Sequence, residues 1–333
     1  MKNKVKLGQF YTKNSHYIIG NLLNDLEKNK IVVEPFCGEG DLLIFENKYE
    51  IYDIEPKIKN CVKRDTLLNP LDFKNKLVIT NPPFLAKNKN FDKTIYNLYD
   101  VNDLYKAAIK TIIECDGGIL ILPLNFFSDE DNKIRDLFFN VFEIINLNIF
   151  EEVVFSDTTY TICSFSFRRK KINNNTMNIK CCFFPKKEIK FFELKKITGW
   201  RVGSDFLELI ENTNNIGIKR LRLNQEPNSN LYLRAIDTGT NNGRISLSIN
   251  KEPFFGKESD RTFATLLMNK KYTEEEEIKI CNEFNKLLEI NREKYNSLFL
   301  TNFRNSTTSY ARKRISFDIA YKIISYIIKK ENL

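Results

Sequence analysis

Six short apolar runs in the first half of the sequence constrain the fold more than any other feature. They lie at 31–33, 50–53, 77–80, 118–122, 144–150 and 159–167. Polar segments with a helix-like pattern separate them, at 15–28, 41–47, 102–115 and 130–141. The early runs are almost continuously apolar, as buried parallel strands are, whereas the last one alternates, as an antiparallel strand would. We therefore predict an open α/β sheet with helices on both faces.

The pattern changes after the last of these runs. Residues 168–176 are polar and basic, and we interpret them as a linker or long loop. The segments beyond it predict a hairpin at 177–194 and helices at 205–213, 273–297 and 313–330. We therefore predict two domains, an α/β domain over 1–170 and an α+β domain over 176–333.

The cysteine and histidine content bears on compartment and chemistry. The seven cysteines include no C-x-x-C pair, and His16 is the single histidine. These features predict reduced thiols in an intracellular protein and argue against a metal site or a Ser-His-Asp triad. The sequence has no apolar run of membrane-spanning length and no signal-peptide core at its start, so we expect neither a membrane partner nor secretion.

Charge is distributed unevenly along the 333 residues. Residues 1–167 hold 20 Lys and Arg against 24 Asp and Glu, whereas residues 168–333 hold 32 against 19. A net charge of −4 beside one of +13 is typical of a polyanion-binding half joined to a half with another role. A solvated basic surface would give the same count, and charge alone does not choose between the two.

A glycine-containing turn follows the first apolar run. It reads Glu34-Pro-Phe-Cys-Gly-Glu-Gly-Asp41 and is expected to open a helix. Glycines at the carboxyl end of a strand let the backbone approach a ligand closely. The leading carboxylate suits a ligand with an ammonium or hydroxyl groups rather than a pyrophosphate, and no Lys-Ser/Thr pair follows as in a P-loop.

Two further strand ends carry a carboxylate. Asp53 ends the second run and could accept the hydroxyls of a ribose, and Asp65 follows the next predicted strand and could accept a hydrogen bond from an adenine amino group. Either residue alone is more simply a helix cap or a loop carboxylate. Because they are ordered with Glu34 and the glycine turn, we predict a nucleoside-cofactor site.

The run 77–80 leads into Asn81-Pro82-Pro83-Phe84. With the glycine turn, the upstream carboxylates and Gly8-Gln-Phe-Tyr-Thr12, this motif resembles the S-adenosylmethionine-dependent amino-group methyltransferases of nucleic acids. The closest resemblance is to the DNA adenine-N6 methyltransferases of the gamma motif order, as in type II restriction–modification, and it covers roughly 7–167. It implies a Rossmann-like, seven-stranded mixed sheet with a C-terminal target-recognition domain.

The resemblance also implies partners and a cofactor site. The partner would be double-stranded DNA, with a cognate restriction endonuclease as a candidate second partner, and the cofactor would be S-adenosylmethionine without a metal. The cofactor-binding residues that it implies are Phe10, Tyr11, Thr12, Glu34, Phe36, Gly38, Gly40, Asp53, Ile54, Asp65 and Asn81.

The catalytic turn has a physical interpretation. The prolines end the strand and hold the residues before them extended, so the turn presents the side-chain oxygen of Asn81 and the carbonyl of Pro82 as acceptors. Two acceptors can hold both N–H groups of an exocyclic amine while positive charge grows on its nitrogen. Phe84 would stack on an adenine flipped out of the duplex. Phe155 would provide a second aromatic wall, with Tyr160 as the alternative, although packing roles for these rings stay open.

Two segments of the second half are candidates for DNA contact. The segment 301–314 mixes hydroxyls, amides and guanidiniums, and 232–244 is rich in turn residues, although it could equally be a plain hairpin. The predicted DNA-binding residues are Arg304, Arg312, Lys313, Arg314, Arg234 and Arg244.

Other functions share parts of this pattern. An RNA adenine-N6 methyltransferase could use the same catalytic turn, and protein glutamine methyltransferases have a similar one, usually with tyrosine after the prolines. A non-catalytic DNA-binding subunit could keep the fold, but it would not need Asn81, Gly38 and Gly40 intact. We therefore predict a site-specific DNA adenine-N6 methyltransferase.

Overall fold

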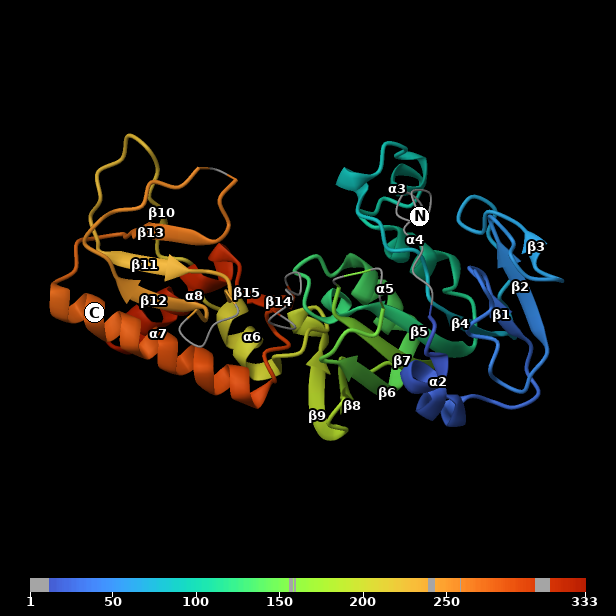
Figure 1. Ribbon diagram of the computed structural model, residues 1–333. Coiled ribbons are helices and arrows are strands. Elements are labelled where there is room, and N and C mark those ends of the chain that lie inside the picture. Colours follow the sequence, from blue (N-terminus) through green and yellow to red (C-terminus); the bar gives the residue numbers. More distant parts are fainter. Residues whose placement is uncertain (1–11, 156–157, 159, 239–242, 258, 303–311) are drawn as a thin grey trace. The chain divides into compact units, whose positions relative to one another are not determined.

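The computed structural model describes residues 12–155, 158, 160–238, 243–257, 259–302 and 312–333 (Figure 1). The chain forms two compact units. The first runs to Phe126 and resumes over Glu130–Trp200, and the second comprises Phe127–Asp129 and Arg201–Leu333.

The first unit is built on a nine-stranded sheet in the order β3-β2-β1-β4-β5-β7-β6-β8-β9. Strands β1 to β5 are parallel, β7 lies antiparallel between β5 and β6, and β8 and β9 form an antiparallel pair beside β6. The predicted α/β class is confirmed. The strands are β1 (Val32–Glu34), β2 (Tyr49–Asp53), β3 (Val62–Lys63), β4 (Leu77–Thr80), β5 (Gly117–Pro123), β6 (Phe142–Phe150), β7 (Ile162–Arg169), β8 (Thr176–Phe184) and β9 (Glu188–Lys195).

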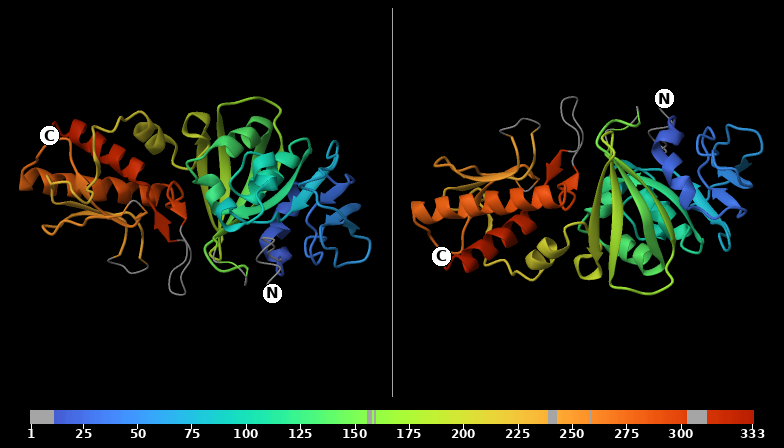
Figure 2. Two further views of the ribbon diagram at one scale, coloured as in Figure 1. Left: turned by 90° about the horizontal axis from the view of Figure 1, so that it is seen from above. Right: turned by 90° about the horizontal axis from the view of Figure 1, so that it is seen from below.

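Helices cover both faces of this sheet, as predicted, and the residues of β7 show how (Figure 2). Phe165 and Phe167 lie 5.8 and 5.2 Å from the ring of Phe138 on α5 (Lys133–Val141). Ser164, which alternates with them, donates a 2.6 Å hydrogen bond to the carbonyl of Ile18 on α2 (Ser15–Ile19). Successive strand residues point to opposite faces, so α2 and α5 pack on opposite sides.

Two predicted helices of this unit are shorter or missing. The segment 15–28 forms α2 and a 3-10 turn, η1 (Gly20–Asp25), and 41–47 forms turns rather than a helix. The Tyr49 hydroxyl accepts from the backbone N–H of Phe45 and donates to the carbonyl of Leu42, so backbone groups of this segment bond to a side chain instead of each other. The glycine turn therefore does not open a helix. The other helical elements are η2 (Lys87–Lys89), α3 (Thr94–Leu98), α4 (Leu104–Thr111), η3 (Leu124–Phe127) and η4 (Lys196–Thr198).

The β8–β9 hairpin differs from the predicted domain division. Residues 177–194 do form a hairpin, but β8 pairs in parallel with β6, so the hairpin extends the first sheet from seven strands to nine. The alternating residues Met177, Ile179, Cys181 and Phe183 are buried in that sheet. The chain therefore passes from the first unit to the second after Trp200, and not in the basic segment 168–176.

This boundary changes the meaning of the charge asymmetry. Residues 168–200 hold 10 Lys and Arg against 2 Asp and Glu, whereas residues 201–333 hold 22 against 17. Most of the positive excess of the C-terminal half thus belongs to residues 168–200, from the end of β7 through the β8–β9 hairpin to η4, which are parts of the first unit. The asymmetry does not divide the chain into a neutral unit and a basic unit.

The second unit is α+β, as predicted. Its four-stranded antiparallel sheet has the order β10-β13-β11-β12, and a two-stranded sheet pairs β14 with β15. Its strands are β10 (Lys219–Arg220), β11 (Leu231–Arg234), β12 (Ser246–Ile249), β13 (Phe263–Leu267), β14 (Thr301–Asn302) and β15 (Lys313–Arg314). Its helices are α6 (Ser204–Glu211), α7 (Glu274–Lys294) and α8 (Phe317–Lys330).

Helix α7 is fixed at its start and against the sheet. Thr273 and Glu276 form a reciprocal capping box at its N-terminus. Midway along it, the Asn285 amide accepts from the backbone N–H of Leu247 at 2.9 Å and donates to its carbonyl at 2.8 Å. Within the described ranges, neither α7 nor any other helix is long and apolar enough to cross a membrane.

Candidate active site

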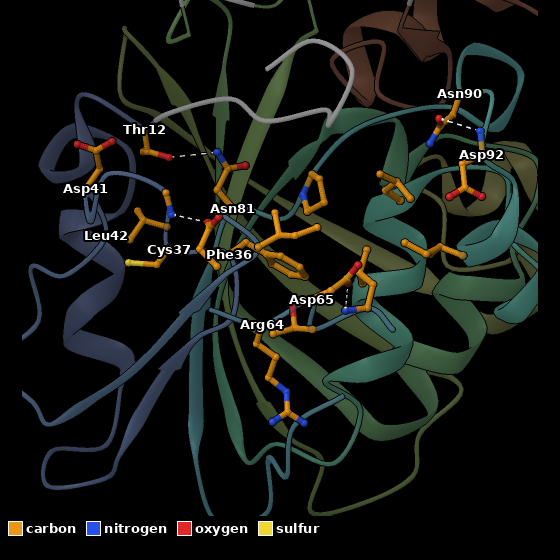
Figure 3. A pocket seen from close by; sticks show the side chains of 18 residues that line it. Thr12, Phe36, Cys37, Asp41, Leu42, Arg64, Asp65, Asn81, Asn90 and Asp92 are labelled. Carbon is orange, nitrogen blue, oxygen red and sulfur yellow. Dashed lines mark hydrogen bonds between the residues drawn. The ribbon is translucent and has the colours of Figure 1, made fainter. Parts of the chain in front are cut away.

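The sheet order creates a switch point between β1 and β4. The chain moves from β1 to β2 and β3 in one direction and returns to β4 on the other side of β1. In open α/β sheets the ligand crevice lies outside the carboxyl ends of the strands at such a reversal. A cavity lies there, and residues that follow β1, β2, β3 and β4 line it (Figure 3).

The glycine turn after β1 forms one wall. Gly38 and Gly40 have φ angles of 55° and 84°, which side-chain-bearing residues rarely adopt. A Cβ on Gly40 would lie 3.0 Å from the Cδ1 atom of Ile58. The N–H of Gly38 donates a 2.8 Å hydrogen bond to Oδ2 of Asp53, which fastens the turn to the end of β2. Gly38 lines the cavity, whereas Gly40 shapes the turn from outside the lining.

Glu34 lies behind this wall and does not line the cavity. Its Oε1 accepts hydrogen bonds from the N–H of Phe36 at 3.0 Å and from the Thr80 hydroxyl at 2.6 Å. The side chain is 1% exposed, and burial raises the pKa of Glu34 to about 8. Glu34 therefore ties the end of β1 to the last residue of β4, immediately before Asn81. Its buried Oε2 has no hydrogen-bond partner within the part of the chain that the structure describes.

The two predicted strand-end aspartates line the cavity together. Oδ1 of Asp53 accepts from the N–H of Glu55 at 2.7 Å, and Oδ1 of Asp65 accepts from those of Leu67 and Leu68 at 3.0 and 3.1 Å. Both therefore act as turn carboxylates, which was the simpler alternative for each. A carboxylate has about four acceptor positions, so these bonds leave capacity for a ligand. The apolar residues Phe36 and Ile54 line the same space.

The charged groups of the lining favour a cationic or donor-rich ligand. Four carboxylates line the cavity, from Asp41, Asp53, Asp65 and Asp92, against the guanidinium of Arg64. Arg64 donates to the carbonyls of Asn69 and Pro70 at 2.8 and 3.1 Å. A phosphate-bearing ligand would meet net negative charge here, whereas hydroxyl, amino and sulfonium groups would be attracted.

Asn81 lies directly after β4 and faces the cavity (Figure 3). Its Nδ2 donates a 3.1 Å hydrogen bond to the Thr12 hydroxyl, and Thr12 also lines the cavity and is 3% exposed. The N-terminal motif and the Asn-Pro-Pro-Phe motif therefore meet at one point. Two other predicted residues of the N-terminal motif, Phe10 and Tyr11, lie outside the described residues.

The predicted aromatic walls do not line the cavity. Phe84 is 3% exposed, and its ring packs edge-on against Tyr105 with centroids 6.3 Å apart. Phe155 is also 3% exposed. Tyr160 is partly exposed, and its hydroxyl lies 3.5 Å from Nζ of Lys89. Pro82 is buried, and Pro83 is the proline that lines the cavity. The structure thus places both phenylalanine rings in packed positions, which for Phe155 was the alternative left open above.

The sequence reasoning missed one wall of the cavity. Asn90, Asp92 and Ile95, on the connection between β4 and α4, also line it, as does Leu104, the first residue of α4. The buried Tyr96 fastens this connection, since its hydroxyl donates to the carbonyl of Leu85 at 2.9 Å. The only signal in the sequence was the position of this segment immediately after the Asn-Pro-Pro-Phe motif.

The predicted DNA-binding residues on β15 and immediately before it differ in exposure. Lys313 is 5% exposed, and its ammonium is 2.5 Å from Oδ1 of Asn302, so it is placed as a structural residue rather than as a phosphate contact. Arg312 is partly exposed, and its Nε donates to the carbonyl of Asp237 at 2.8 Å. Arg314 is partly exposed, and Arg304 lies outside the described residues.

The other two predicted arginines lie at the end of β11 and just before β12. Arg234, on β11, has its guanidinium carbon 5.9 Å from the ring centroid of Phe263. Arg244 is exposed and forms a 2.9 Å ion pair with Glu289. β11 pairs antiparallel with β12, which begins just after residue 244. The two strands joined by this segment therefore form a hairpin, the alternative interpretation of 232–244.

Comparisons with known proteins give partial structural likenesses. No family model matches the sequence, and no curated protein matches it significantly. A protein described as a modification subunit of a type I restriction enzyme from Vibrio vulnificus YJ016 aligns at 13% identity with a TM-score of 0.43 over 54% of this chain and 48% of its own.

Two further solved structures align to a similar extent. The type I restriction enzyme EcoKI M protein aligns at 14% identity, with a TM-score of 0.42 over 53% of this chain and 49% of its own. A type I restriction–modification methyltransferase subunit from Streptococcus thermophilus aligns at 13%, with a TM-score of 0.40 over 63% and 55%. The matched region thus spans about half the length of each of these three proteins.

Proposed function

We propose that this protein is an S-adenosylmethionine-dependent methyltransferase that modifies the exocyclic N6 of adenine in duplex DNA. The observation that carries the proposal is that Asn81 faces the same cavity as the strand-end carboxylates Asp53 and Asp65. A methyl donor and a target amine must meet in one place, and these residues are suited to hold one each.

The lining fits the proposed cofactor. Asp53 would accept the ribose hydroxyls and Asp65 the adenine amino group, while Phe36 and Ile54 would contact the apolar faces of the nucleoside. The excess of carboxylates suits a ligand that carries a sulfonium and an ammonium group. When bound, S-adenosylmethionine would supply an electrophilic methyl group, whose bond to sulfur would break as the amine bonds to carbon, leaving S-adenosylhomocysteine.

The catalytic turn would hold the target amine. In this proposal Oδ1 of Asn81 and the carbonyl of Pro82 accept the two N–H groups of adenine N6. Thr12 positions the Asn81 amide, because it accepts a hydrogen bond from Nδ2 of that amide. As the amine nitrogen forms its new bond to carbon, positive charge develops on it, and the fixed acceptor dipoles stabilise that charge. The methylated amine then releases its proton to solvent, so no catalytic histidine is required.

The proposed mechanism assigns no required role to the two predicted aromatic walls, Phe84 and Phe155. Phe84 and Phe155 are both buried, so either ring would contact a flipped adenine only after a change in its packing. The mechanism therefore depends on Asn81 and not on these rings. For DNA contact, Arg312 and Arg314 remain candidates in the second unit, together with Arg304, Arg234 and Arg244, whereas the buried Lys313 is left out.

An Asn81→Ala variant tests the catalytic assignment. We expect methyl transfer to fall by at least about 100-fold, the typical cost of removing one transition-state hydrogen-bond partner. The affinity for S-adenosylmethionine, measured by calorimetry, should change by less than about threefold, because the interaction that is removed would form with the target amine in the transition state and not with the bound cofactor. The matched control is Asn178→Ala, which removes an exposed amide on β8. Wild-type turnover by the Asn81→Ala enzyme would overturn the assignment.

A further inference from the structure

The connection after the catalytic turn carries the most exposed large apolar side chain among the described residues. Phe91 is 101% exposed, whereas the next most exposed, Ile172 and Leu223, are 72% exposed. The ring of Phe91 contacts no other described ring. Single exposed apolar residues are ordinary on protein surfaces, so exposure alone assigns no role to Phe91.

The position of Phe91 is what distinguishes it. Asn90 and Asp92, the residues on either side, both line the cavity that Asn81 faces (Figure 3). Phe91 itself does not line the cavity, so it lies at its rim and points to solvent. We name residues 87–93 the rim loop. A base that enters the cavity to reach Asn81 therefore comes close to this loop, because Asn90 and Asp92 line the same cavity.

Hydrogen bonds of the rim loop fix its backbone while the ring stays outside. The N–H of Asp92 donates to Oδ1 of Asn90 at 3.2 Å, and Nδ2 of Asn90 donates to the buried Tyr96 hydroxyl at 3.3 Å. On the other side, Oδ1 of Asp92 accepts from the N–H of Thr94 at 2.8 Å. The residues before and after Phe91 are therefore held in place by hydrogen bonds, and Phe91 is exposed on a loop with a defined conformation.

The rim loop is also cationic. It carries Lys87, Lys89 and Lys93 against one carboxylate, Asp92. The ammonium of Lys87 donates to Asn97, that of Lys89 to the Tyr160 hydroxyl, and that of Lys93 to two loop carbonyls. None of the three pairs with a carboxylate of the described residues. The positive charge around Phe91 is thus available to a polyanion, as the phosphates of a duplex would require.

We propose that Phe91 inserts into the base stack of duplex DNA beside the target adenine and occupies the space that the flipped base leaves. This inference rests on the proposed function. Apolar side chains inserted between base steps, with cations on the adjacent phosphates, are a recurrent way for proteins to open a duplex. An aromatic ring replaces part of the stacking that the extruded base loses.

The test compares variants on two duplexes. The first is an oligonucleotide duplex with the site mapped from wild-type methylation of unmethylated DNA. The second is identical, except for an abasic position opposite the target adenine, which removes its pairing. On the matched duplex we expect Phe91→Ala to reduce kcat/KM by about 10- to 100-fold, the range that one base–aromatic stacking interaction sets. On the abasic duplex most of that activity should return.

Matched variants separate insertion from other roles. Phe91→Trp keeps a stacking surface and should remain close to wild type on both duplexes. Leu98→Ala removes another exposed apolar side chain, 61% exposed, at the end of α3, and should leave both rates unchanged. The affinity of Phe91→Ala for S-adenosylmethionine should also equal that of wild type.

Three results would contradict the inference in distinguishable ways. If wild type methylates the matched duplex and Phe91→Ala equals it, insertion by Phe91 is wrong and the proposed function stands. An equal loss on both duplexes would likewise overturn insertion, because it would indicate a role in binding rather than in base extrusion. If wild type methylates no position in unmethylated DNA, no site can be mapped, and the proposed function fails together with the inference.

Discussion

Glu34 ties the ends of β1 and β4 together from inside the sheet, through Phe36 on one side and Thr80 on the other. It was predicted from the sequence as a cofactor contact. The strand-end position was right, but the side chain points into the sheet and not into the cavity. Its function in the site is to position the turn that carries Asn81.

The buried carboxyl of Glu34 makes stability depend on pH. Burial raises its pKa from the ordinary value of 4.5 to about 8. Between these values the unfolded chain loses the proton while the folded protein keeps it, so stability falls as pH rises from about 4.5 to about 8. The slope is at most about 1.4 kcal/mol per pH unit. Glu34→Gln, which is neutral throughout, should remove this contribution.

Urea unfolding at pH 5, 6.5 and 8 checks this expectation. The stability of Glu34→Gln relative to wild type should increase with pH, and an exposed control, Glu46→Gln, should show a constant difference. A difference between Glu34→Gln and wild type that is the same at pH 5 and pH 8 would contradict a raised pKa for Glu34.

Strand-end reasoning placed Asn81, Asp53 and Asp65 together, and they line one cavity, because such reasoning depends only on local order along the chain. Each residue follows an apolar run, and parallel strands bring such positions to one edge of the sheet. The aromatic assignments depended on packing between distant segments. Phe84 lies against Tyr105, on α4, and no local pattern reveals that contact. The contribution of the rim loop to the cavity was not predicted for the same reason.

At the level of elements, the β8–β9 hairpin shows what periodicity cannot decide. The alternation of Met177, Ile179, Cys181 and Phe183 predicts a strand with one buried face, and it forms one. It does not say which sheet buries that face. The polar segment 168–176 suggested a boundary, whereas parallel pairing with β6 keeps the hairpin in the first unit.

The position of the hairpin gives its lysines a predicted role. β7 is antiparallel to both β5 and β6, so β6 runs in the same direction as β5, and β8 is parallel to β6. The turn that follows β8 therefore lies at the same end of the sheet as the carboxyl ends of the parallel strands, where the cavity is. Lys180, Lys186 and Lys187 are exposed, and no ion pair engages them among the described residues. We expect them to contact phosphates of the bound DNA.

Salt-dependent DNA binding measures this contribution. Replacing Lys180, Lys186 and Lys187 by Gln should reduce the slope of log K against log salt by about 0.9 for each phosphate that the protein no longer neutralises. The control replaces Lys28, Lys48 and Lys74, which are exposed residues before β1, β2 and β4 at the opposite sheet edge. If both triple variants keep the wild-type slope, the hairpin makes no phosphate contacts.

For the molecule as a whole, the sequence predicted the fold class of each unit better than the position of the boundary between the units. Alternation of apolar runs with polar segments predicted the α/β class, and the change of pattern after 168 predicted an α+β second unit. The count of charges by halves was misleading, because the division into units falls at Trp200 and Arg201. Residues 168–200 carry most of the basic excess, and they belong to the unit whose sheet forms the cavity.

The most direct test of the central claim is methyl transfer from radiolabelled S-adenosylmethionine to unmethylated duplex DNA, with RNA and protein assayed in parallel. Nucleoside analysis of the product identifies the atom modified. We predict label in the N6-methyladenine of DNA, and none when Asn81→Ala replaces the wild-type enzyme. Label confined to RNA or protein, or no label from enzyme that binds the cofactor, would contradict the account.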